Sequence, residues 1–289
     1  MNAALHQPRR VVGGEMSDAV FAAVSRIAHR EAGLVLAQSK MAMVKSRLTR
    51  RLRVLKLPSF EDYIEFVENP GNAGEMPFLV SALTTNVSHF FREKHHFDRL
   101  KSEVLPPLLK KAAAGGRVRI WSAGCSNGQE TYSMAMTLLE MDPNILSRDV
   151  RILGTDIDND VLQTAREGFY ANTMLSGLED NHLRDWFSAE SLEGEDGYRA
   201  SQKLRDLVTY RKLNLHGDWP MNGCFDIIFC RNVVIYFDED TQTRLYQRFQ
   251  NILSDDGWLF LGHSERIGEA ANSLFTSSGV TAYRVAKGA

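Results

Sequence analysis

The sequence predicts an α/β protein in which an all-helical N-terminal domain precedes an open sheet of alternating strands and helices. Up to about residue 95, apolar residues recur at spacings of three and four, which is the helical period. After Gly115-Gly116, short apolar runs alternate with helical segments, as is typical of a mostly parallel sheet covered by helices. We therefore expect a flexible stretch 1–16, a helical domain 17–95 and an α/β domain 96–289.

The composition is that of an ordinary globular protein, and 289 residues are enough for more than one domain. Lys and Arg number 34 against 36 Asp and Glu, so the net charge of −2 gives the whole molecule no strong preference for polyanions. The three cysteines form no Cys-x-x-Cys pair, which argues against a disulfide framework and fits a reducing cytoplasm. No run approaches the ~20 apolar residues of a membrane span, so we expect a cytoplasmic protein without membrane insertion.

Four helices are expected in the N-terminal domain. Ser17 is placed to cap the first and Ser59 to begin the third, because serine oxygens accept bonds from free N-terminal amides. Pro58 ends the second helix, and a turn at 69–72 precedes a fourth that the pattern extends from Met76 to Phe91. The second helix carries one apolar stripe, formed by Met41, Val44, Leu48, Leu52 and Leu55.

The α/β domain is expected to contain six main strands. The run 225–230 is almost continuously apolar, as in a strand buried on both faces. Between about 171 and 206 the alternation lapses into polar, turn-rich sequence, which we interpret as an inserted β-subdomain built on a hairpin. The predicted strands are 118–121, 150–153, 207–213, 225–230, 258–261 and 281–285, and the predicted helices are 130–140, 160–167 and 239–253.

Two features of this domain bear on ligand binding. After the first strand, Gly124 and Gly128 lie in a run of small residues before a helix, which lets the backbone approach a ligand, although a plain strand-to-helix turn explains them equally well. Asp156 ends the next strand, where an acid accepts ribose hydroxyls in nucleotide-binding folds; its alternative role is a helix N-cap. Together the two features favour binding of an adenosine-containing ligand over the structural alternatives.

The buried strand 225–230 leads directly into Arg231, Asn232 and Tyr236 at the carboxyl edge of the sheet. Arg-Asn directly after a buried strand is difficult to explain as packing. Phe237, by contrast, is interpreted as a core aromatic. The absence of an Asn-Pro-Pro-Tyr or Asp-Pro-Pro-Tyr motif after this strand argues against methyl transfer to the exocyclic amines of DNA bases.

The segment 84–93 contains paired aromatics beside Asn86, Ser88 and Arg92. Periodicity alone favours a packing role for this segment. The neighbouring His89, His95 and His96 predict no metal site, since no partner cysteine or spaced carboxylate was found to complete one.

The second helix also carries a row of cations. Six Lys or Arg lie within the twelve residues 45–56, and no acid lies among them, which is more than solubility requires and favours an acidic partner. Nucleic acid and an acidic protein helix are the two candidates. The residues proposed to dock this partner are Lys45, Arg47, Arg50, Arg51 and Arg53.

Six segments, taken together and in order, closely resemble the chemotaxis receptor glutamate methyltransferases, the CheR family. The resemblance spans about Ser17 to Val285. The segments are Thr-Thr-Asn-x-Ser-x-Phe-Phe-Arg-Glu (84–93), Trp-Ser-Ala-Gly-Cys-Ser-x-Gly-x-Glu (121–130), Gly-Thr-Asp-Ile-Asp (154–158), Arg-Glu-Gly-Phe-Tyr (166–170), Phe-Asp-Ile-Ile-Phe-Cys-Arg-Asn-Val-Val-Ile-Tyr-Phe (225–237) and Gly-His-Ser-Glu (262–265).

The resemblance implies a helical domain, a Rossmann-like S-adenosylmethionine-dependent methyltransferase domain and a small inserted β-subdomain. It also implies S-adenosyl-L-methionine as cofactor and S-adenosyl-L-homocysteine as product. Arg92 would bind the methionine carboxylate and Asp156 the ribose hydroxyls. The full set of implied cofactor residues, including Gly124 of the glycine turn, is Asn86, Ser88, Arg92, Gly124, Glu130, Asp156, Asn214, Leu215, Arg231 and Asn232.

The implied reaction is methyl esterification of glutamate carboxylates on chemoreceptors. Tyr236 and Arg231 are the expected catalytic residues, and the basic helix is the expected dock for acidic methylation helices. Family members that bind a receptor's C-terminal peptide use a Gly-rich loop of the β-subdomain, which the stretch 192–197 does not clearly match. A nucleic-acid methyltransferase and a non-catalytic S-adenosylmethionine-binding adaptor remain as alternatives; no nucleic-acid partner is expected, because the basic helix lacks interleaved aromatics.

Overall fold

The computed structural model describes residues 14–221 and 223–286, so most of the stretch predicted to be flexible, 1–16, lies outside the described residues. The chain divides into two compact units, Met1–Thr84 and Thr85–Ala289. The boundary predicted from the sequence is at residue 95. The segment between belongs to the second unit because Phe90, fully buried, packs edge-on against Tyr170 and Phe187 of that unit.

The first unit is all-helical, as predicted. Its helices are α1 (Asp18–Ala32), α2 (Met41–Leu55), α3 (Phe60–Glu68) and α4 (Met76–Leu83), with short 3₁₀ turns η1 (Gln38–Lys40) and η2 (Pro70–Glu75). Ser17 caps α1 by accepting a bond from the Val20 amide, and Ser59 caps α3 through the Asp62 amide. The predicted stripe is confirmed at its centre, where Val44, Leu48 and Leu52 are fully buried.

The prediction of a helix from Met76 to Phe91 is wrong beyond Leu83. Thr84 is extended (φ −77°, ψ 153°), and its hydroxyl donates to the Ser81 carbonyl at 2.9 Å. The residues that follow include β-branched threonine and valine and short polar side chains, which lose rotamer freedom in a helix or compete for its backbone bonds. The chain therefore remains non-helical through Ser88.

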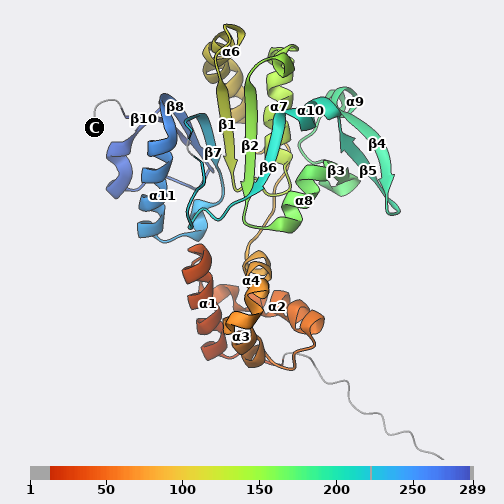
Figure 1. The fold of residues 1–289 in the computed structure, drawn as a ribbon, viewed down its shortest axis with the longest axis vertical. Helices are drawn as coiled ribbons and strands as arrows, with labels where there is room; N and C mark the ends of the chain where they lie inside the picture. The colour runs from red at the N-terminus through yellow and green to blue at the C-terminus, as the bar shows by residue number, and fades with distance from the viewer. Residues whose placement is uncertain (1–13, 222, 287–289) are drawn as a thin grey trace, which may run out of the picture. The chain divides into compact units, whose positions relative to one another are not determined.

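The second unit is built on a seven-stranded sheet in the order β6-β2-β1-β7-β8-β10-β9. Strands β6, β2, β1, β7 and β8 are parallel, whereas β10 is antiparallel to both β8 and β9 (Figure 1). Their bounds are β1 (Val118–Ala123), β2 (Val150–Asp156), β6 (Val208–Lys212), β7 (Phe225–Cys230), β8 (Leu253–Leu261), β9 (Phe275–Ser277) and β10 (Ala282–Val285). The predicted open α/β fold is confirmed.

Alternating residues of the buried strands supply two cores, one on each face of the sheet. On β7, Ile227 and Phe229 join one core, while Ile228 and Cys230 join the other. The first core is completed from α5 (Lys94–Arg99), α6 (Leu105–Ala113), α7 (Gln129–Met141), α8 (Asn159–Glu167) and α10 (Gln202–Leu207), and the second from α11 (Glu239–Ile252). This period-two alternation is what a strand buried on both faces requires.

The stretch interpreted as an insertion forms a separate three-stranded antiparallel sheet in the order β3-β5-β4. Its elements are β3 (Phe169–Ala171), α9 (Asp180–Trp186), β4 (Phe187–Leu192) and β5 (Glu195–Ala200). The predicted hairpin is β4–β5, and its two-residue turn has positive φ at both Glu193 (52°) and Gly194 (86°), as a type I′ turn requires. Among the described helices, none is long and apolar enough to cross a membrane.

Candidate active site

The motif residues of the second unit gather where the parallel strands end. The chain runs outward from β1 through β2 to β6, then returns to place β7 on the other side of β1. The carboxyl ends of β1 and β7 therefore flank a topological switch point, which is where open α/β sheets bind their ligands. Gly124 follows β1, Asp156 ends β2, Asn214 and Leu215 follow β6, and Arg231 follows β7.

The loop after β1 requires glycine at its first position. Gly124 has φ 87°, and an added Cβ there would lie 2.4 Å from Cγ2 of Val233. Its amide and that of Cys125 both donate to the Thr155 carbonyl at 2.8 Å, which ties this loop to the end of β2. The loops after β1, β2 and β7 are thus packed against one another without room for a side chain at Gly124.

Asp156 binds the backbone of the same loop through its carboxylate. It is 8% exposed, and its carboxylate accepts the Ser126 amide at 2.8 Å and the Asp158 amide at 3.1 Å. Helix α8 is capped by Asp158, which accepts the Asp160 amide, so the N-cap role considered for Asp156 is excluded. Burial raises the pKa of Asp156 to about 6, against the opposing effect of these backbone donors.

The segment 85–93 is joined to these loops by its own hydrogen bonds. The Asn86 amide group donates to Asp158 at 2.7 Å, and the Asn86 carbonyl accepts the Ser126 hydroxyl at 2.9 Å. Ser88 is half-buried in the same non-helical run, and Arg92 donates to the Val87 carbonyl at 2.9 Å. Phe90 and Phe91 both fit the packing role that periodicity favoured for this segment, since Phe90 is buried and Phe91 packs edge-on against Phe97. The polar residues Asn86, Ser88 and Arg92 do not take part in this packing.

Arg231 contacts two other predicted residues, Glu130 and Arg92. It is 6% exposed and donates to Glu130 at 3.0 Å and to the Arg92 carbonyl. Glu130 also accepts the Ser122 hydroxyl at 2.7 Å. Burial raises the pKa of Glu130, and the neighbouring guanidinium of Arg231 opposes that effect.

Glu93 is a site residue that sequence reasoning missed. Glu93 has φ 57°; its carboxylate lies 3.3 Å from Arg231 and accepts the His263 amide at 3.0 Å. Burial disfavours the ionised carboxylate, but Arg231 and His263 outweigh it and lower the pKa of Glu93 to about 2. The Phe-Phe-Arg-Glu motif carries the signal, because Glu93 directly follows Arg92, for which the family resemblance implies a cofactor contact.

Glu93 also changes the assessment of the histidines. Its carboxylate lies with His95 and His96 in a group whose ligand atoms are within 4.8 Å of one another, so the expectation that no carboxylate accompanies them is wrong. The oxygen that faces His96, however, is the one paired with Arg231. A divalent cation there would lie beside a buried guanidinium, an unfavourable arrangement of like charges.

The loop after β7 places Asn232 and Tyr236 at the edge. Asn232 has φ 59°, and Tyr236 lies half-buried in the short turn η6 (Val234–Tyr236). The loop after β6 starts beside Asp156, because the Leu213 amide donates to the Asp156 carbonyl at 2.9 Å. Asn214 accepts the His216 amide at 3.0 Å, and Leu215 is buried.

The five predicted docking cations of α2 are not equivalent. Arg51, itself half-buried, forms an ion pair with the buried Glu75, and Arg47 donates to the Ala82 carbonyl at 3.1 Å at the end of α4. Lys45 pairs with Glu15 at 3.2 Å. Arg50 and Arg53 are exposed. Two of the five therefore hold the helical unit together.

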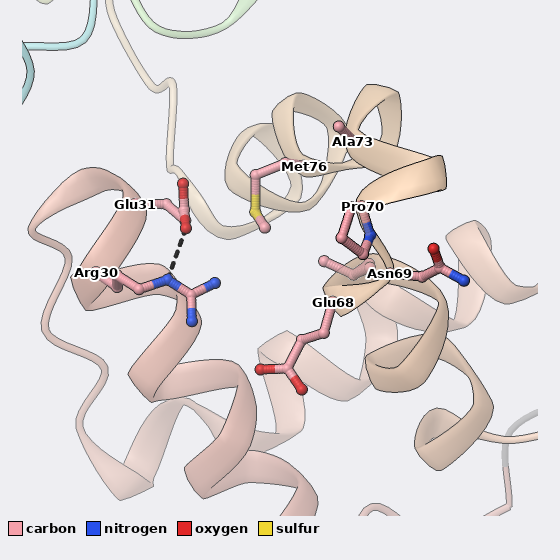
Figure 2. A pocket seen from close by; sticks show the side chains of 8 residues that line it. Arg30, Glu31, Glu68, Asn69, Pro70, Ala73 and Met76 are labelled. Atoms are coloured by element: carbon pink, nitrogen blue, oxygen red, sulfur yellow. Dashed lines mark hydrogen bonds and ion pairs between the residues drawn. The ribbon is translucent and has the colours of Figure 1, made fainter.

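The helical unit also contains a hollow of about 560 Å³ between α1, α3 and η2 (Figure 2). Arg30 donates to Glu31 at 2.7 Å at its rim, and Glu68 lies opposite. Within the described residues, none of the side chains lining this hollow has a buried polar atom without a partner.

A mostly parallel open sheet, with a glycine turn after its first strand and a buried carboxylate at the end of its second, is the arrangement of Rossmann-like proteins that bind an adenosine-containing cofactor. The chain belongs to the CheR methyltransferase family. Residues 19–84 match the family's all-alpha domain, and residues 86–284 match its S-adenosylmethionine-binding domain.

Curated relatives are similar over nearly the whole chain. A probable chemotaxis protein methyltransferase of Rhizobium etli is 45% identical over 256 residues, which cover 89% of this chain and 96% of that protein. The chemotaxis protein methyltransferase of Escherichia coli is 40% identical over 275 residues, which cover 94% and 92%.

The protein is thus a methyltransferase whose cofactor is S-adenosylmethionine, and the edge of the sheet fits that group. A ribose diol needs acceptors, and each Asp156 oxygen that receives one backbone amide keeps a further lone pair. An amino-acid moiety needs both a cation and an anion, and the edge contains Arg92, Arg231, Glu130 and Glu93.

Proposed function

We propose that this methyltransferase acts in bacterial chemotaxis, in the cytoplasm, and transfers the methyl group of S-adenosylmethionine to glutamate side-chain carboxylates of chemoreceptors. The observation that carries the proposal is the convergence of Asp156, Glu130 and Arg231 at one edge of a domain whose relatives are named chemotaxis methyltransferases. The product esters are neutral, so the reaction removes negative charge from the receptor.

Each residue of the edge has a proposed task in cofactor binding. Asp156 accepts the ribose hydroxyls, and Arg92 binds the methionine carboxylate by charge-assisted hydrogen bonds. Glu130, held by Ser122 and Arg231, offers an anion to the amino group. Asn86, Ser88, Gly124, Asn214, Leu215 and Asn232 complete the proposed cofactor site.

The proposed chemistry requires little of the protein beyond positioning. A glutamate side chain has an ordinary pKa of about 4.3, so the acceptor is already ionised at neutral pH and needs no general base. The cofactor supplies a methyl group activated by its sulfonium. Tyr236 and Arg231 shape the acceptor pocket, and holding the two reactants in line can contribute roughly 7–11 kcal/mol.

The exposed cations of α2 are the proposed dock for the acidic methylation helices. Arg50 and Arg53 are available for this task, whereas Arg51 is paired with Glu75. A receptor C-terminal peptide is a second proposed contact. Strand β4 lies at the end of the three-stranded sheet, and such an outer strand can accept an added strand.

The decisive experiment combines the protein with S-adenosylmethionine labelled in the methyl group and membranes that contain a chemoreceptor. Label should appear on the receptor and leave as methanol in mild base, because carboxyl methyl esters are base-labile. Base-stable label, or label on nucleic acid, would assign the activity to another acceptor. Cofactor binding without any transfer would favour the adaptor.

A further inference from the structure

The segment Gly262–Glu265 directly follows β8 and has no task in the proposed reaction. Strands β7 and β8 are parallel, and their last residues pair, Cys230 with Leu261. The segment therefore lies beside the loop that carries Arg231, Asn232 and Tyr236.

Glu265 binds the backbone of this loop. Its side chain is 2% exposed, and one carboxylate oxygen accepts the Asn232 amide at 2.8 Å and the Gly262 amide at 2.5 Å. The other oxygen accepts the Ile235 amide at 3.3 Å. One buried carboxylate thus bridges both ends of the stretch 232–235, which lies between the cofactor residue Asn232 and the acceptor residue Tyr236.

The loop needs this support because its backbone is unusual. Asn232 adopts the left-handed region, which few non-glycine residues other than asparagine and aspartate occupy and in which surrounding contacts hold it. Gly262 permits the close approach, since an added Cβ would lie 2.7 Å from the Asn232 nitrogen and 2.8 Å from the Glu265 carboxylate.

The same segment is also connected to Arg231 through Glu93. The His263 amide donates to Glu93 at 3.0 Å, and Glu93 pairs with Arg231 at 3.3 Å. Residues 262–265 therefore contact the loop after β7 directly through Glu265 and indirectly through Glu93.

We propose that Glu265 is a positioning residue, which fixes Asn232 for the cofactor through one oxygen and Tyr236 for the acceptor glutamate through the other. The inference rests on the proposed function, because the tasks of Asn232 and Tyr236 belong to that proposal. The inference predicts that a substitution of Glu265 can release the Ile235 end of the loop without releasing the Asn232 end.

Glu265→Gln makes this separation. The glutamine side chain retains one oxygen. That oxygen is most favourably placed where it accepts the two short hydrogen bonds from the amides of Asn232 and Gly262. Its NH₂ group then faces the Ile235 amide, and two donors repel. Glu265→Gln should therefore keep Asn232 in place and release Ile235 with the neighbouring Tyr236, whereas Glu265→Ala leaves the amides of Asn232, Gly262 and Ile235 without this acceptor.

The test compares wild type, Glu265→Gln, Glu265→Ala and the matched control Glu269→Gln, whose carboxylate is exposed. Amide hydrogen exchange at Asn232 and Ile235, the Kd for S-adenosylhomocysteine, and kcat on receptor-containing membranes are measured for each. Glu265→Gln should speed exchange at Ile235 but not Asn232, leave Kd within about twofold and lower kcat about tenfold to a hundredfold. Glu265→Ala should also weaken cofactor binding, and Glu269→Gln should match wild type.

Wild-type exchange at Ile235 together with wild-type kcat in Glu265→Gln would overturn the inference. Equal loss of protection across the whole second unit would also overturn it, since Glu265 would then serve only general stability. If wild type transfers no methyl to receptors, the proposed function fails, while the exchange pattern and the Kd still decide whether Glu265 holds the two ends of the loop.

Discussion

Arg51 and Glu75 are joined by two hydrogen bonds, Nε to Oε1 at 2.8 Å and Nη2 to Oε2 at 2.6 Å, although 24 residues separate them in the chain. The Tyr63 hydroxyl donates to the same carboxylate at 2.9 Å, and the Arg51 guanidinium lies 4.3 Å from the ring centroid of Phe78. This cluster joins α2 to α3, η2 and α4. Arg51, which the sequence predicts to bind a partner, thus connects helices within the helical unit.

Glu75→Ala should therefore destabilise the helical unit. Removing the buried Glu75 carboxylate leaves the buried Tyr63 hydroxyl without its acceptor and the half-buried Arg51 without its ion pair, at a cost of about 1–3 kcal/mol. Native-state hydrogen exchange of the α2 amides measures the loss. The exposed Arg53→Ala serves as control and should change stability by less than about 0.5 kcal/mol. Equal effects of the two variants would contradict the internal role of Arg51 and Glu75.

The double variant Arg50→Glu/Arg53→Glu should impair receptor methylation without disturbing the helical unit. Like charges would then face the acidic acceptor helices, so KM for receptor membranes should rise and the cofactor Kd should stay constant. Because the exposed charges are screened over about 10 Å at 0.1 M salt, the wild-type rate should fall as salt increases. Lys203→Glu on α10, also exposed, is the matched control, and an equal loss there would contradict a local dock.

Cofactor binding should weaken below pH 6. The pKa of Asp156 is raised to about 6 from an ordinary 3.8, so protonation of the free protein begins well above the usual range. Only the ionised form offers full acceptor capacity to ribose hydroxyls, so Kd for S-adenosylhomocysteine should rise about tenfold per pH unit below 6. Calorimetry between pH 5 and 7 measures it. Asp156→Asn should bind weakly at every pH in this range, and a variant that kept the wild-type pH profile would exclude Asp156 as its source.

Tyr236→Phe should lower kcat about tenfold or more, since a hydrogen bond to a charged acceptor is worth about 1.5–3 kcal/mol. The cofactor Kd should hardly change, because the hydroxyl is proposed to serve the acceptor. Single-turnover methyl transfer isolates the chemical step. Tyr283→Phe on β10 controls for loss of a hydroxyl elsewhere in the unit, and full activity in Tyr236→Phe would remove this residue from the site.

Gly124→Ala should weaken cofactor binding and lower Tm. Alanine is disfavoured at φ 87°, and its Cβ would lie 2.4 Å from Val233, so the loops after β1 and β7 must separate. Gly268→Ala provides the comparison, since Gly268 has φ −69° and open space around its Cα. A Gly124→Ala protein as stable and as tight-binding as Gly268→Ala would refute the close contact.

Local pattern in the sequence was enough to predict most of the elements. The strand expected at 225–230 is β7 (Phe225–Cys230), and Asp156 lies at the end of β2, as expected. Both predictions rest on neighbours within a few residues, where period-two burial and strand ends leave a direct trace. The prediction of a helix up to Phe91 also rested on local pattern, and it failed. The spacing of the aromatic residues resembled a helical face, whereas residues 84–88 disfavour a helix.

The sequence by itself determined the succession of strands and helices, the inserted hairpin and, through its motifs, the family and the cofactor. Only the tertiary structure decided which charges meet. In the folded chain, Arg51 pairs with Glu75, Glu93 pairs with Arg231, and Glu265 accepts the Asn232 amide of the loop after β7. Periodicity reports what one segment buries, whereas an ion pair or a buried carboxylate depends on residues tens of positions apart, whose meeting is set by how the strands and helices pack.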